Sequence, residues 1–489
     1  MRLCLLLLFI GIRSLSIGQT NLSNYTPLPY FPLELDEIDA LKKTFEIRAQ
    51  GLDLSKPEEK KLALEFANDL GASLIEENKH GFISRGDSLS IYLQKIVDRI
   101  VERNNLEQDY YRVYLSLSDV PNAANYGEGF IVFNLGLLAK LPEEAHIAFV
   151  LCHELAHDLE DHVFGGIKKK VEVLESETYK KRLKEIKDLP YNQRAAALSL
   201  RNEYLSQFNE HGREHELEAD SIGLLLLKNA GYQLHAGAET VRLLDTADLL
   251  PIAPVAFTSF YQFERFPFQE KWLLEEKQNS WGSNLDEYVF PDSLKTHPSC
   301  ALRDSALSRL MAELSQSTEI EAIAPGDHYP VMAIFENLEY LKKQGLYAEM
   351  LYRSLALERL YPNNLYIKNS IGFALYGIYS AQYSHFFSRA VPIAGSGMQE
   401  DYATLLRFLH RLTLSTLKSH FTSYVYERLP EKGVDDYTDM LFALAECVED
   451  ADLEERRLIK ENYKNQYGEN SHFIFLNKQF PEPVEKKKK

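Results

Sequence analysis

The chain has 489 residues and a formal net charge of −18 at pH 7, and 45% of its residues are hydrophobic. That length allows about three domains of ~150 residues, and the composition excludes a wholly disordered or collagen-like chain. Nucleic-acid binding is also disfavoured, because phosphates are held by clustered Lys and Arg side chains and this chain is acidic. We therefore expect several apolar cores and no nucleic-acid partner.

Residues 1–18 predict a signal peptide. Arg2 precedes an apolar run from Leu3 to Ile12, and the small residues Ser16 and Gly18 stand at the positions −3 and −1 of a cleavage site. A retained membrane anchor is the competing interpretation, but a span needs ~20 apolar residues and a cation interrupts this run. No later stretch is apolar for long enough to cross a bilayer. We therefore expect an exported protein, periplasmic or extracellular, with no integral membrane span in the mature chain.

The elements predicted up to the middle of the chain are helices around two short strands. A polar, Pro-rich leader is followed by two helical patterns over 33–79 and by an amphipathic helix over 88–101. Alternation predicts strands over 111–117 and 129–134, with a turn at 121–125 between them. A helix that is apolar on nearly all sides then runs from Pro142 to about His162, and such a helix is buried.

The second half of the chain is predicted to be almost entirely helical. A charged hairpin over 166–210 turns at Asp188-Leu189-Pro190, a helix runs from Glu214 to Lys228, and residues 250–300 are rich in loops. From Tyr329 onward helix pairs occur without strands. One stretch, 348–364, resembles a tetratricopeptide unit, but a solenoid needs at least ~3 units and only this one is recognisable.

These patterns predict an α+β fold that is mainly α. The expected parts are an N-terminal helical segment at 19–84, a domain with a small sheet at 85–324, an all-α tail at 325–480 and a disordered basic end at 481–489. After the predicted signal peptide, three cysteines remain at wide spacing. They form neither a disulfide framework nor a metal knuckle, and buried thiols are expected.

The buried helix carries His153-Glu154-Leu155-Ala156-His157, an H-E-x-x-H motif. The i, i+4 spacing places both imidazoles on one helical face, where they can share a metal ion. Glu154 lies about 100° round the helix, where it can reach a water molecule beside the metal. Burying these polar groups in an apolar helix is destabilising unless each has a hydrogen-bond partner or a bound metal ion. We therefore predict one zinc ion per chain, with Glu154 as the general base.

A catalytic zinc needs a third protein ligand and an open fourth position. The metzincin spacing fails, because Glu160 and Val163 stand where that class has Gly and His. His162 lies about 140° from His157 on a continuous helix and is interpreted as a helix-end residue.

The strongest candidate for the third ligand is Glu216, on a second buried helix. Asp220 shares its face and is placed to accept a hydrogen bond from a ligand histidine. Glu218 is expected to point away from that face, and His211 and His215 remain rival ligands.

Four ordered blocks carry a resemblance to a known family. The blocks are HELAH, ELEAD about sixty residues later, NAGY at the end of the following helix, and THPSCALR around His297. They resemble the HtpX-like and BepA-like zinc endopeptidases of metallopeptidase family forty-eight, which also includes the CAAX prenyl protease. The stretch PNAANYGEGFIVFNLGLL resembles the strand and turn that precede the zinc helix in this family. The resemblance covers about residues 85–310 and leaves the tail uncovered.

The resemblance implies a gluzincin-type zinc metallopeptidase domain. The residues that would bind zinc are His153, His157 and Glu216. Glu154 would be the general base, and Asp220 would support a ligand. His297 would stabilise the oxyanion or position substrate, and Arg303 would pair with acids near the site. The transmembrane helices of the HtpX and prenyl-protease branches are missing from the pattern, which disfavours intramembrane substrates.

The function implied is zinc-dependent hydrolysis of peptide bonds in protein substrates, in turnover or quality control of envelope proteins. The tail would be available to a protein partner, and the strand at 129–134 would hold an extended substrate by edge pairing. The alternative is a chaperone-like or protein-binding module with a vestigial or self-blocked zinc site. A purely structural zinc site is the third interpretation, and it would need four protein ligands.

Overall fold

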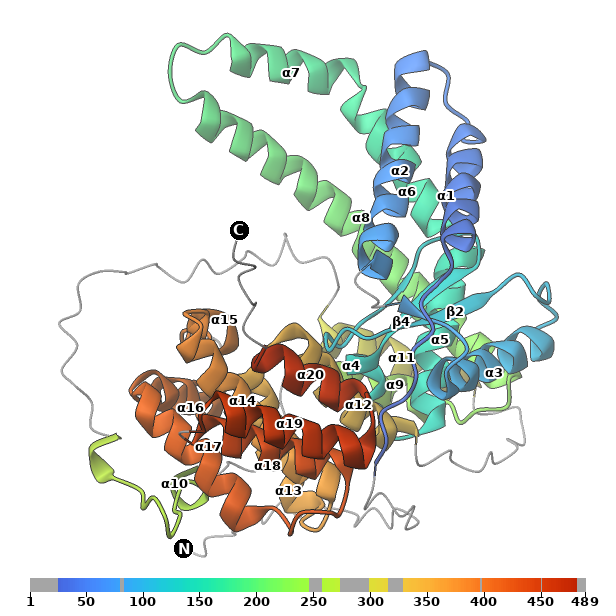
Figure 1. Ribbon diagram of the computed structural model, residues 1–489. Coiled ribbons are helices and arrows are strands. Elements are labelled where there is room, and N and C mark those ends of the chain that lie inside the picture. Colours follow the sequence, from blue (N-terminus) through green and yellow to red (C-terminus); the bar gives the residue numbers. More distant parts are fainter. Residues whose placement is uncertain are drawn as a thin grey trace, which may run out of the picture.

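The computed structural model describes residues 25–79, 83–245, 257–272, 299–314, 329–395, 398–449 and 451–481. Figure 1 shows how the elements of these ranges are arranged. The predicted signal peptide, the candidate His297 and the chain after Pro481 lie outside the described residues. Within the described ranges the fold is mainly helical with one small sheet, as predicted.

The sheet has four short strands in the order β1-β2-β4-β3. The central strands β2 (Arg112–Ser116) and β4 (Phe130–Asn134) pair in parallel, and β1 (Ile83–Ser84) and β3 (Ala123–Asn125) pair antiparallel at the two edges. Both predicted strands are confirmed, but the predicted turn at 121–125 contains the edge strand β3. Three residues are too few for alternation to indicate a strand.

Alternate side chains of the two central strands enter different cores, because successive residues of a strand point to opposite faces. Leu115 and Phe133 join the core formed with α3 and α5, whereas Tyr114 and Phe130 join the core formed with α1, α2 and α6. Helices therefore cover both faces of the sheet. These covering helices are α1 (Leu35–Gln50), α2 (Pro57–Lys79), α3 (Ser88–Arg103), α5 (Glu144–Leu159) and α6 (His162–Leu174).

The helix α3 shows how local sequence sets an element's limits. Asp87 caps its N-terminus by accepting hydrogen bonds from the backbone N–H groups of Leu89 and Ser90, at 2.9 Å each. The remaining helices of this half are α4 (Leu135–Leu138), α7 (Glu177–Lys187), α8 (Gln193–Asn229), α9 (His235–Leu244) and α11 (Cys300–Leu314).

The helices α7 and α8 form an arm that projects from the body (Figure 1). The predicted turn of this hairpin is confirmed, since α7 ends at Lys187 and α8 begins at Gln193. The helix predicted from Glu214 is not separate, however. It is the continuation of α8, which spans 37 residues, because Gly212 alone does not end a helix. One rod therefore runs from the tip of the arm into the core.

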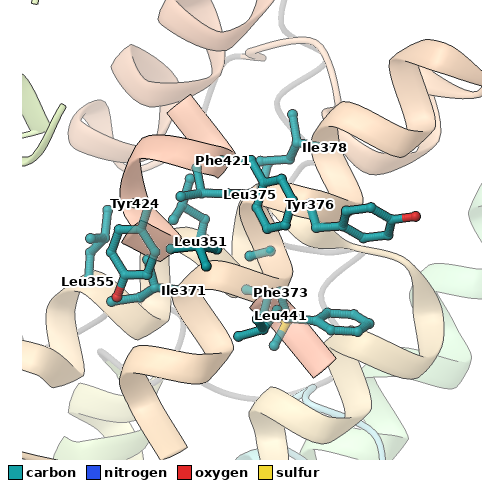
Figure 2. Close-up of a cluster of buried hydrophobic side chains, with 14 of the residues drawn as sticks. Leu351, Leu355, Ile371, Phe373, Leu375, Tyr376, Ile378, Phe421, Tyr424 and Leu441 are labelled. Atoms are coloured by element: carbon teal, nitrogen blue, oxygen red, sulfur yellow. The ribbon is translucent and has the colours of Figure 1, made fainter. Parts of the chain in front are cut away.

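The tail is an all-α body with a core of its own. Figure 2 shows part of this core, where aromatic and aliphatic side chains from several helices interlock. The repeat resemblance stays a prediction. The tail's elements are α12 (Tyr329–Gln344), α13 (Tyr347–Leu360), α14 (Leu365–Tyr383), α15 (Phe387–Ala390), α16 (Glu400–His410), α17 (Leu414–Arg428), α18 (Asp436–Val448), α19 (Leu453–Tyr467) and α20 (Ser471–Gln479), with α10 (Phe257–Phe260) and the 3-10 turn η2 (Glu270–Trp272) packed nearby.

The N-terminal leader joins the tail to the first half of the molecule. Glu336 of α12 is fully buried, and its carboxylate accepts hydrogen bonds from the hydroxyls of Tyr25 and Tyr30 and, at 2.8 Å, from the backbone N–H of Leu28. Tyr329 of the same helix stacks on Tyr92 of α3, with ring centroids 3.9 Å apart.

Two further sequence predictions concern cysteines and the membrane. Cys152, Cys300 and Cys447 are free thiols, and two of the three are buried, as expected. Among the helices of the described ranges, none combines the length and the apolar character that a bilayer crossing requires.

Candidate metal centre

The helix α5 supplies three polar side chains from an otherwise apolar, buried segment. His153 and Glu154 are each only 7% exposed, and His157 follows one turn after His153 on the same face. Within α5 the sequence is rich in Ala and Leu, so the helix itself offers few polar partners. A buried polar group without a partner is destabilising, so the partners of this face must come from other elements.

The helix α8 crosses α5 so closely that the two backbones nearly touch. A Cβ on Gly223 would stand 3.1 Å from the backbone nitrogen of His153 and 3.2 Å from its Cα. Glycine permits this close crossing, since a Cβ here would require the two helices to move apart by a few tenths of an ångström. The close approach carries Glu216 and Asp220, two turns and one turn earlier in α8, over the imidazoles of α5.

Within the described ranges, His153, His157 and Glu216 form one group whose ligand atoms converge. The Nε2 atoms of the two histidines are 3.1 Å apart, and the Glu216 carboxylate oxygens lie 3.6 Å from Nε2 of His153 and 3.4 Å from Nε2 of His157. Four tetrahedral ligands at zinc bond lengths stand about 3.4 Å from one another. The three distances are close to this value, with Oε2 of Glu216 toward His153 and Oε1 toward His157, and a fourth ligand would come from outside these three residues.

The electrostatics of the group also fit a cation. Burial disfavours the charged form of His153, yet hydrogen bonds and charge from Asp220 and Glu216 raise its pKa to about 10. The two carboxylates therefore hold a positive charge at this point, as a proton or as a metal ion. Two imidazoles and one carboxylate are the donor set of a catalytic zinc site of the His₂Glu type.

Asp220 and Arg303 extend the site behind His153. The Nδ1 atom of His153 lies 3.0 Å from Oδ1 of Asp220, and Arg303 of α11 donates to both oxygens of that carboxylate at 2.7 and 2.8 Å. Burial opposes ionisation of Asp220, but Arg303 and His153 lower its pKa below the usual value. Arg303 also lies 3.8 Å from Glu216. The structure thus brings together the predicted pair Asp220 and Arg303, and fixes the orientation of His153.

His162 lies elsewhere than the sequence predicted. The helix α5 ends at Leu159, and Asp161 adopts a left-handed conformation with φ +54° before α6 begins at His162. This turn brings Nδ1 of His162 to 2.8 Å from Nδ1 of His157. The expected 140° separation was wrong because it assumed that the helix continued through residues 160 and 161.

Glu218 and the rival ligands surround His162 instead of joining the metal group. Glu218 points away from the face of Glu216, as expected, and its Oε2 lies 3.3 Å from Nε2 of His162. The ring of His215 stacks on that of His162 at 4.0 Å, and His211 packs on His215 at 4.2 Å.

Two residues of the site were missed by sequence reasoning. The role of Gly223 depends on a crossing of two helices that are about seventy residues apart in the chain. The position of His162 depends on a turn that the pattern of apolar residues did not mark. The third histidine at +5 from an H-E-x-x-H motif was itself visible. His297 lies outside the described residues.

Comparison with known proteins agrees with this geometry. Residues 88–311 match the profile described as Peptidase family M48. A stretch of 131 residues is 32% identical to the mitochondrial metalloendopeptidase OMA1 of Arabidopsis thaliana, and it covers 26% of this chain and 24% of that protein. The matched stretch thus spans about a quarter of the relative's length. The profile begins with α3 and ends within α11, so it includes every described residue of the metal centre, and both similarities support a metallopeptidase domain of the M48 type over residues 88–311.

Proposed function

We propose that the protein is a zinc-dependent endopeptidase that cleaves protein substrates outside the cytoplasm. The observation that carries the proposal is the convergence of His153, His157 and Glu216, whose ligand atoms lie within 4.8 Å of one another. A structural site would have a fourth protein ligand. Among the described residues the converging group has three, which favours a catalytic site.

His153, His157 and Glu216 would hold the ion, and Glu154 would serve as general base. A zinc ion bound here would polarise the scissile carbonyl and acidify a water molecule. Glu154 accepts the proton of the attacking water and returns it to the leaving amine, so that the proton count balances over the cycle. Its burial at 7% exposure keeps bulk water away from this transfer. His297 is the candidate for stabilising the oxyanion.

The strand that offers an edge to substrate is β3. The predicted edge strand, 129–134, contains β4, which is internal and pairs with both β2 and β3. The backbone N–H of Tyr126 donates to the carbonyl of Phe130 at 2.9 Å, and that of Asn134 donates to the carbonyl of Asn122 at 2.9 Å. Because pairing alternates along an antiparallel strand, the backbone groups of Ala123 face the free edge. We propose that an extended substrate pairs there.

The decisive experiment compares the wild-type protein with Glu154→Gln. Purified wild type is expected to hold about one zinc per chain and to degrade a casein-like substrate, and a chelator should abolish the activity. Glu154→Gln should keep the zinc and lose turnover, because the amide cannot accept the proton. A protein-binding module would show no turnover in either form, and an unaltered rate in Glu154→Gln would refute the proposed mechanism.

Export and the role of the tail are further parts of the proposal. The charged start, the apolar run and the small residues at 16 and 18 support cleavage after Gly18. Turnover of envelope proteins is the role proposed at such a location, and the all-α tail would receive a protein partner or guide substrates. Mass spectrometry of the mature protein isolated from its host should find an N-terminus at Gln19.

A further inference from the structure

We infer that His162 is a positioning residue for the metal ligand His157, and that Glu218 fixes His162 in turn. The inference rests on the proposed zinc site and deepens it. His153 has a carboxylate directly behind it, at 3.0 Å in Asp220. Among the described residues no carboxylate takes that place behind His157. An imidazole stands there instead, with Glu218 behind the imidazole.

The placement of protons along this chain of groups has a single consistent solution. Nε2 of His157 belongs to the metal group, so its lone pair is directed at the ion and its proton sits on Nδ1. That Nδ1–H donates across 2.8 Å to Nδ1 of His162, which must therefore be unprotonated. The remaining proton of His162 sits on Nε2 and donates to the Glu218 carboxylate at 3.3 Å.

The surroundings of His162 hold the ring in the orientation that this chain of hydrogen bonds needs. Its side chain is 7% exposed, and the ring of His215 lies parallel to it at 4.0 Å with an interplanar angle of 4°. The stacked ring and the two hydrogen-bond partners together leave His162 one orientation, with Nδ1 toward His157 and Nε2 toward Glu218.

The backbone turn before His162 is fixed as well. Asp161 occupies the left-handed region at φ +54°, which aspartate adopts more readily than most other non-glycine residues. Its carboxylate is held by Arg48 of α1 at 2.6 Å, and the same guanidinium contacts Glu128 at 3.1 Å. This turn, held by contacts from a distant helix, places His162 back over His157 instead of further along α5.

The test measures the zinc affinity of three variants of His162 by competition with a chromogenic chelator. In His162→Asn the amide oxygen takes the place of Nδ1 and still accepts the hydrogen bond from His157. In His162→Gln the amide oxygen takes the place of Nε2, and the hydrogen bond from His157 is lost. His162→Phe keeps a ring and removes both nitrogens. We expect zinc affinity about 10- to 100-fold below wild type in the Phe and Gln variants, and within about threefold of wild type in the Asn variant.

Two further variants keep the test decisive if a substitution at the buried position 162 fails to fold. Glu218 is half-exposed, with a side-chain exposure of 52%, so Glu218→Ala is expected to fold, and it should weaken zinc binding by about three- to tenfold. The matched control is Glu214→Ala, one turn earlier on α8, whose carboxylate lies 3.4 Å from His211 and outside this chain of groups. It should bind zinc as wild type does. The unfolding temperature of each metal-free variant separates weaker metal binding from loss of fold.

The outcomes separate this inference from the proposed function. A wild-type protein that binds no zinc would refute both. Wild-type binding together with unchanged affinity in His162→Phe and Glu218→Ala would refute the positioning role and leave the peptidase proposal standing. Equal losses in the Asn and Gln variants would also refute it, since the role depends on which nitrogen accepts the hydrogen bond.

Discussion

His420 offers the most direct test of the energetics of the tail. It lies on α17 with no exposed surface, and its ring is 4.5 Å from that of Tyr261 and 5.0 Å from that of Trp272, centroid to centroid. Within the described ranges, neither ring nitrogen has a hydrogen-bond partner. Burial among aromatic rings lowers the pKa of His420 to about 3. The perturbation we consider is His420→Phe, which keeps a ring and removes the titration.

The sign of the effect follows from proton linkage. In the unfolded chain His420 takes up a proton as the pH falls through ~6.5, whereas in the folded tail it stays neutral until about pH 3. The unfolded state therefore gains protons over this window, and the tail loses stability as the pH falls. Between pH 7 and pH 5 this one residue lowers the free energy of unfolding by about 2 kcal/mol. The Phe variant should not show this pH-dependent loss.

Trp272 provides the assay, because it lies against His420 and reports on the unfolding of this part of the tail. The chain has two tryptophans, so the measurements are made in a Trp281→Phe background. Urea titrations at pH 7 and pH 5 give the free energy of unfolding for each protein. The pH-dependent loss should be about 2 kcal/mol smaller in His420→Phe.

The control for this experiment is His410→Phe, which changes an exposed histidine of α16 and should keep the wild-type pH dependence. A pH-dependent loss that differs by less than about 0.5 kcal/mol between the wild type and His420→Phe would refute the reasoning. The folded tail would then have to accommodate the charged imidazole.

Two further predictions concern the peptidase half. Ala123→Pro removes a backbone N–H that faces the free edge of β3, so cleavage of an unfolded protein should fall sharply in a proteolysis assay while the zinc content stays at the wild-type level. Gly223→Ala should weaken zinc binding in a chelator competition, because the new Cβ stands against the backbone of His153 and separates α8 from α5. This loss is expected despite the roughly 1 kcal/mol that Ala gains over Gly in helix propensity, and unchanged affinity would show that the close crossing does not set the ligand geometry.

The parts of the metal centre that follow from local helical geometry could be predicted from the sequence. The i, i+4 spacings of His153 with His157 and of Glu216 with Asp220 fix which side chains share a face. The resemblance of the HELAH and ELEAD blocks to a known family indicated that the two faces meet, and the structure brings them together.

The parts that depend on a change of chain direction or on a contact between helices could not be predicted. His162 was placed on the wrong side because α5 ends before it. The residue that turns the chain in the left-handed conformation is Asp161, and no glycine in the sequence marks the turn. The edge strand β3 is too short for alternation to indicate it, and β4, which was expected to offer a free edge, is internal. Gly223 looked like an ordinary helical residue, because the atoms that a Cβ would crowd belong to α5.

The continuity of α8 has a consequence for where the sequence of this protein can change in length. His215, Glu216, Glu218 and Asp220 occupy less than two turns of one 37-residue helix. Inserting or deleting one residue between the tip of the arm and these positions would rotate the arm by about 100° relative to the buried half of the helix, and would shift it by about 1.5 Å along the axis. An insertion or deletion between His215 and Gly223 would by itself rotate Glu216 and Asp220 away from α5. Insertions at residues 188–192, where α7 ends and α8 has not begun, leave that phase untouched and should be the ones that natural variation accepts.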